Sequence, residues 1–171
     1  MEHDFRLTRR GFATAVAAIG TLAILGCGED AQSRTEPGAP QSQAPAGAEE
    51  MVVYRDPNCP CCEKWAAMAK EAGYQVRVID HPDMTRIKAQ YGVPEALRSC
   101  HTTIVGDYAL EGHVPFEHVA RLLRERPDAI LGLAVAGMPA GSPGMEVPDG
   151  AKDDFAVMAF RKHGAPSPFA A

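Results

Sequence analysis

The order of short apolar segments between residues 51 and 123 constrains the fold of this chain more than any other feature. Apolar residues alternate with polar ones in some segments and recur at helical spacing in others. Glycine, proline and aspartate separate the segments. In chain order the segments are 51–54, 65–72, 74–80, 84–91, 102–114 and 115–123. They predict strand, helix, strand, helix, hairpin and helix.

This is the element order of a thioredoxin-like domain, so we predict an α/β fold with such a domain over 51–163. With 171 residues, 46% of them hydrophobic, the chain is long enough for one ordinary domain. From Ile130 onward the sequence is rich in glycine and proline and includes Met138 and Met145. We expect a Gly/Pro/Met-rich loop as a C-terminal extension, an edge strand in "FAVMAF" (155–160), and a disordered tail over 164–171.

The first fifty residues predict export rather than folded structure. Arg9 and Arg10 precede an apolar run that is shorter than the ~20 residues of a membrane-spanning helix. Residues 1–26 therefore resemble a twin-arginine signal peptide. "AILGC" resembles a lipoprotein cleavage box with Cys27 as the lipidated residue, although an ordinary signal peptide or an uncleaved anchor would also fit. Residues 27–50 have the composition of a disordered tether. We predict a lipid-anchored protein in the periplasm or on the cell-envelope face.

Three cysteines lie within four positions in the stretch "CPCC", where the first strand gives way to the first helix. Cys61 and Cys62 are neighbours, and their Cα spacing of about 3.8 Å is shorter than a relaxed disulfide prefers. Cys59 and Cys62 have C-x-x-C spacing, and a helix N-terminus favours the thiolate form. Cys100 precedes the third strand, so the predicted topology brings it to the same edge. We predict a site of four thiols.

The thiols predict binding of a soft metal ion. A haem attachment motif is excluded because Glu63 stands where histidine would be required. A zinc site usually takes two well-separated cysteine pairs, whereas three thiols are local here. Soft ligands in this arrangement favour Cu(I), with several ions bridged by sulfur. His101, next to Cys100, and His113, on the following strand, are candidate additional ligands.

Several motifs together resemble the CopG-like family of exported bacterial proteins, long described as a domain of unknown function and associated with copper resistance. They are "CPCC", "GVPEALRSCHT", "YALEGHVP", "RPDAILGLAVAGMPAGSPGME" and "FAVMAF". The resemblance runs from Val52 to about Phe160. It implies a thioredoxin-like fold, Cu(I) held by the four cysteines, and a function in copper redox handling. Pro60 is a departure, since family members often have glycine there.

Three functions remain open. The first is a cell-envelope Cu(I)-binding protein of copper resistance or homeostasis, which would exchange copper ions with envelope chaperones or redox proteins. The second is a thiol-disulfide or copper oxidoreductase that uses Cys59 and Cys62 as catalytic thiols. The third is a lipoprotein scaffold with structural disulfides. The net charge of −5 offers no basic surface for nucleic acid.

Overall fold

The computed structural model describes residues 49–169, and the predicted export signal, Cys27 and the tether as far as residue 48 lie outside this range. Eleven elements are present within the described residues. In chain order they are β1 (Met51–Arg55), α1 (Pro60–Glu71), β2 (Val76–Asp80), α2 (Met84–Gln90), the 3-10 helix η1 (Glu95–Leu97), β3 (His101–Val105), β4 (Tyr108–Glu111), α3 (Phe116–Glu125), β5 (Gly132–Ala134), β6 (Met158–Phe160) and β7 (Ser167–Pro168).

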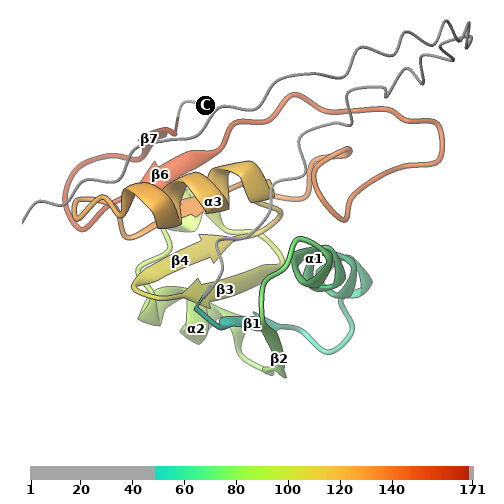
Figure 1. Ribbon diagram of the computed structural model, residues 1–171, viewed down its shortest axis with the longest axis horizontal. Coiled ribbons are helices and arrows are strands. Elements are labelled where there is room, and N and C mark those ends of the chain that lie inside the picture. The colour runs from blue at the N-terminus through green and yellow to red at the C-terminus, as the bar shows by residue number, and fades with distance from the viewer. Residues whose placement is uncertain (1–48, 170–171) are drawn as a thin grey trace, which may run out of the picture. The chain divides into compact units, whose positions relative to one another are not determined.

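The strands form one mixed sheet in the order β2-β1-β3-β4-β5-β6-β7. Figure 1 shows β1 to β4 side by side, with α3 drawn next to β4 in this view. β1 is parallel to β2 and antiparallel to β3, and β3 and β4 form a hairpin. In the β1–β3 register Arg55 faces His101, so the end of β1 and the start of β3 share one edge of the sheet. The α/β class is confirmed, and the thioredoxin-like assignment remains a prediction that this strand order favours.

Apolar side chains from alternate strand positions pack on both faces of the sheet. One face carries the larger core, in which Trp65 of α1 and Leu122 of α3 pack with Leu110 of β4. The other face carries a smaller core around Ala109 and Phe160. Because α1 packs on the sheet through buried residues from Cys62 to Ala69, its first turn is held close to the sheet edge.

The C-terminal extension differs from the sequence prediction in two places. The Gly/Pro-rich segment that we read as a loop contains β5, which pairs parallel to β4. A Cβ atom at Gly132 would collide with the carbonyl of Ala109 and the ring of Phe160, so glycine allows this close pairing. The segment Ser167–Pro168, inside the predicted disordered tail, pairs with β6. β6 therefore lies between two strands rather than at the edge.

Candidate metal centre

The "CPCC" stretch forms the N-terminal turn of α1. Cys59 is the residue before the helix and Pro60 is the first helical residue, a position where proline's fixed φ angle is favourable. The guanidinium of Arg55 donates to the Cys59 carbonyl at 3.2 Å and pairs with Glu63 and Asp80, both at 2.9 Å. The turn is thereby tied to the ends of both β1 and β2.

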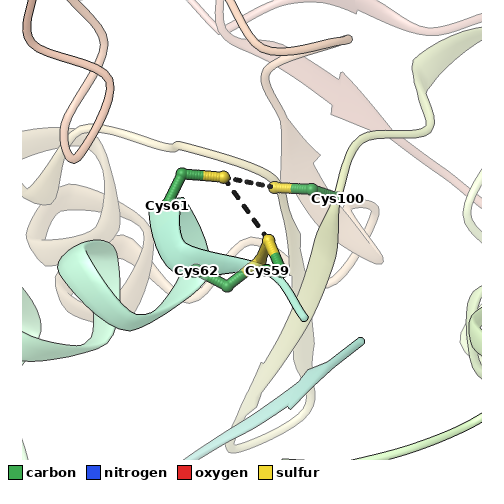
Figure 2. A group of neighbouring side chains, drawn as sticks. All are labelled: Cys59, Cys61, Cys62 and Cys100. Carbon is green, nitrogen blue, oxygen red and sulfur yellow. Dashed lines mark hydrogen bonds between the residues drawn. A yellow bond between two sulfur atoms is a disulfide. The ribbon is translucent and has the colours of Figure 1, made fainter. Parts of the chain in front are cut away.

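Four sulfur atoms meet at this turn. Cys59 and Cys62 form a disulfide, while Cys61 and Cys100 are free thiols. Cys61 Sγ lies 3.4 Å from Cys59 Sγ and 3.8 Å from Cys100 Sγ, and the four atoms all lie within 4.8 Å of one another. Figure 2 shows Cys61 and Cys100 pointing toward each other across the gap between α1 and the start of β3. The predicted proximity of Cys100 to "CPCC" is confirmed, whereas ligation by these residues remains a prediction.

Two imidazole rings lie against Cys100. Its Sγ is 3.3 Å from His101 Nδ1 and 3.1 Å from His113 Nε2, and both rings are fully buried. The Nδ1 atom of His113 is 2.7 Å from the Pro143 carbonyl, which can only accept, so Nδ1 carries the proton. The lone pair of His113 Nε2 then faces the Cys100 sulfur. Cys100, His101 and His113 form a second group of potential ligand atoms within 4.8 Å of one another.

Burial keeps these groups neutral. Removal from water, and secondarily the nearby Cys61, raise the pKa of the Cys100 thiol to about 12. Burial also lowers the pKa of His113 and lowers that of His101 well below its usual value. Neutral imidazole is the form that binds a metal, and a bound cation can displace the proton of a thiol. The site is therefore suited to take up a cation with release of protons.

The C-terminal extension covers part of the site. Pro143 accepts from His113, and Ser99 Oγ donates to the Gly137 carbonyl. A Cβ atom at Gly144 would lie 3.0 Å from the backbone nitrogen of Trp65 and 3.2 Å from the Cys61 carbonyl oxygen, so this loop touches the first turns of α1. Met138, by contrast, is 55% exposed.

Comparisons with known proteins identify relatives of this chain. Residues 97–145 match a family model described as "Protein of unknown function, DUF411". Two solved structures, titled copper resistance protein CopG form 1 and form 2, are each 36% identical with a TM-score of 0.67. They cover 72% of this chain and 96% and 97% of their own chains. The chain belongs to the CopG family. No curated protein matches it.

The matched segment of the family model contains half of the candidate site. It includes Cys100, His101 and His113, while the "CPCC" turn lies before its start. Two charged residues behind Cys100 were missed by sequence reasoning, namely Lys88 and Glu111, which form a buried ion pair. Glu111 was seen only as a strand residue, because hydropathy patterns do not reveal which buried polar side chains pair with each other.

A cavity elsewhere in the described chain is separate from the site. The structure has a cavity of about 430 Å³ lined by residues such as Tyr91, Ile104 and Leu131, but no cysteine or histidine lines it.

Within residues 49–169, no helix is both long and apolar enough to cross a bilayer. Cys27, the predicted lipidation site, lies outside the described residues.

Proposed function

We propose that this protein binds Cu(I) in the cell envelope as part of copper resistance or homeostasis, and that it holds more than one ion. The observation that carries this proposal is the convergence of Cys59, Cys61, Cys62 and Cys100, whose sulfur atoms lie within 4.8 Å of one another. This is about twice a metal–sulfur bond of ~2.3 Å. One ion can therefore contact two sulfurs, and one sulfur can bridge two ions.

The donor set supports copper over harder ions. Thiolates are soft ligands that select Cu(I), and buried neutral histidines can complete the coordination. The relatives titled copper resistance proteins support the same choice. Loading all four sulfurs requires that the Cys59–Cys62 disulfide first takes up two electrons and two protons to give two thiols. Copper uptake should then depend on the presence of a reductant.

A Cu(I) competition titration tests this proposal. The full chain is reduced without oxygen and titrated against a Cu(I)-specific chelator, with Zn(II) in a parallel series. We expect more than one Cu(I) per chain and much tighter binding of Cu(I) than of Zn(II). Cys27→Ser serves as the matched control and should bind as the wild type does. Failure of the reduced wild type to compete for Cu(I) would contradict the proposal.

A thiol-disulfide or copper oxidoreductase is the second candidate. The observation that favours it is the Cys59–Cys62 disulfide with the free thiol of Cys61 3.4 Å from Cys59. Exchange chemistry requires a thiol positioned near a disulfide. The test is rapid reduction of a model disulfide by reduced, copper-free protein, with Cys59→Ser as the inactive control. A scaffold with two disulfides is less favoured, because Cys61 and Cys100 are free.

Export and lipid anchoring complete the proposal. The motivation is the twin-arginine and "AILGC" order of residues 1–27. Mass spectrometry of the membrane fraction should find an N-terminus at Cys27 that carries lipid, and Cys27→Ser should release the protein from the membrane. An unlipidated N-terminus at another residue would contradict the anchor while leaving the copper proposal intact.

A further inference from the structure

A buried ion pair lies directly behind the Cys100 segment. Lys88 of α2 donates to Glu111 Oε1 at 2.6 Å, and the two side chains are 7% and 0% exposed. Glu111 Oε1 also accepts from the Ser99 backbone N–H at 2.6 Å, and its Oε2 accepts from the Thr102 hydroxyl at 2.7 Å. Lys88 lies 3.3 Å from the same hydroxyl. A buried ion pair often gives no more stability than apolar residues of similar size. Stability alone therefore does not account for this pair.

Glu111 is the first of three consecutive residues that contact the segment 99–101. The second, Gly112, donates its N–H to the His101 carbonyl at 2.9 Å. A Cβ atom at this glycine would collide with the Ser99 side chain and would lie 2.7 Å from the Val135 carbonyl. The third, His113, places Nε2 3.1 Å from Cys100 Sγ. Residues 111–113 therefore contact each member of the Ser99–His101 segment.

We propose that Glu111, held by Lys88, is a positioning residue that fixes the Ser99–His101 segment so that Cys100 Sγ faces Cys61. This inference rests on the proposed copper site, because that site requires Cys100. An amide keeps only one of the two oxygens of the Glu111 carboxylate. Its NH2 group faces either the Thr102 hydroxyl, which must then give up the hydrogen bond that it donates, or the Lys88 ammonium and the Ser99 N–H, which can only donate. In either orientation the negative charge opposite Lys88 is lost. The uncompensated ammonium of Lys88 then favours a rearrangement that exposes it to water. Cys100 moves with this segment.

A metal-free cross-linking experiment isolates the position of Cys100. In oxidised full-length protein carrying Cys27→Ser, the Cys59–Cys62 disulfide leaves Cys61 and Cys100 as the free thiols. A short bifunctional alkylating reagent either bridges the two thiols or caps each one, and mass spectrometry gives the ratio of the two products. We expect this ratio to fall severalfold in Glu111→Gln. The control is Glu125→Gln, which alters an exposed ion pair on α3 and should keep the wild-type ratio.

Copper binding gives the second measurement. In the reduced protein, Glu111→Gln should weaken Cu(I) binding about tenfold or more, the usual cost of losing an outer partner of a metal ligand. The same substitution in a Cys100→Ser background should cost nothing further, because Glu111 acts through Cys100. A general structural defect would weaken both backgrounds equally. Lys88→Met/Glu111→Leu, an apolar pair of similar size, removes both buried charges together and leaves only the neutral Ser99 N–H and Thr102 hydroxyl without their acceptor. It should fold and show the same low bridging ratio.

The outcomes separate this inference from the proposed function. If the wild type fails to bind Cu(I) while bridging still depends on Glu111, the positioning inference stands and the copper proposal fails. Wild-type bridging in both Glu111→Gln and the apolar double variant would overturn the inference. An equal loss of copper affinity with and without Cys100 would overturn it as well. If Glu111→Gln does not fold, the double variant decides.

Discussion

At the scale of single residues, Cys100 is where the two halves of the candidate site meet. It has the sulfur of Cys61 on one side and the imidazoles of His101 and His113 on the other. A ligand at this position can bridge a sulfur-rich group and a nitrogen-containing group. None of the other three cysteines belongs to both groups of potential ligands within residues 49–169.

The central position of Cys100 leads to a prediction for its replacement. Cys100→Ser should reduce copper stoichiometry or weaken Cu(I) affinity nearly as much as Cys62→Ser, by more than about tenfold, since even outer partners of ligands cost 10- to 100-fold. Met138→Leu, at a side chain 55% exposed, should have a smaller effect. Chelator competition on the three reduced variants measures this. A Cys100→Ser protein with wild-type copper content would remove Cys100 from the site.

At the scale of elements, the contact between the extension and α1 depends on Gly144. This glycine has a φ of +82°, and a Cβ atom would press on the backbone nitrogen of Trp65 and the backbone carbonyl of Cys61. Gly150 has a φ of +70° but has open space around its Cα. Alanine at either position carries a left-handed backbone cost of roughly 1–2 kcal/mol, and only Gly144→Ala adds the contact.

We therefore predict that Gly144→Ala lowers the free energy of unfolding more than Gly150→Ala does. Denaturant unfolding of the oxidised protein measures the difference, and the shared backbone cost cancels between the two variants. The additional loss arises because backbone atoms of α1 cannot move aside as the end of a flexible side chain can. Equal losses in the two variants would mean that the loop does not press on α1.

The elements also show which parts of the fold can be predicted from the sequence. The strands and α-helices between residues 51 and 123 were predicted because their apolar periodicity is strong and is punctuated by glycine and proline, whereas the short helix η1 was not. β5 was missed, since Gly132 reads as loop although it is the residue that permits pairing with Ala109. β7 was missed because two residues that include Pro168 carry no periodic signal.

At the scale of the whole described chain, the site could be anticipated only as far as topology allows. Antiparallel pairing of β1 and β3 brings Cys100 to the "CPCC" turn, and this follows from the element order. The anchoring of Cys100 by Lys88 and Glu111 does not, because it joins α2 to β4 through side chains whose partners the sequence does not name. The same holds for Pro143, which the extension brings to His113.

The C-terminal end also packs on α3, and this contact includes a histidine. The ring centroids of Phe169 and His118 are 6.2 Å apart. The guanidinium carbon of Arg121 lies over the Phe169 ring, 4.8 Å from its centroid. Burial lowers the pKa of His118, with the nearby Glu117 opposing and Arg121 reinforcing the shift. Its Nδ1 atom is buried without a hydrogen-bond partner among the described residues.

This lowered pKa predicts a loss of stability in mild acid. Above the unfolded-chain pKa of about 6.5, His118 is neutral in both states and carries no pH-dependent cost. As the pH falls below that value, the unfolded chain binds the proton more readily than the folded protein does, so unfolding becomes more favourable. The decline continues until the folded-state pKa is reached. The free energy of unfolding should therefore fall less between pH 7.5 and 5.5 in His118→Gln than in the wild type. His163→Gln is the control for removing an exposed histidine, and the same pH slope in His118→Gln and wild type would refute this account of the α3 contact.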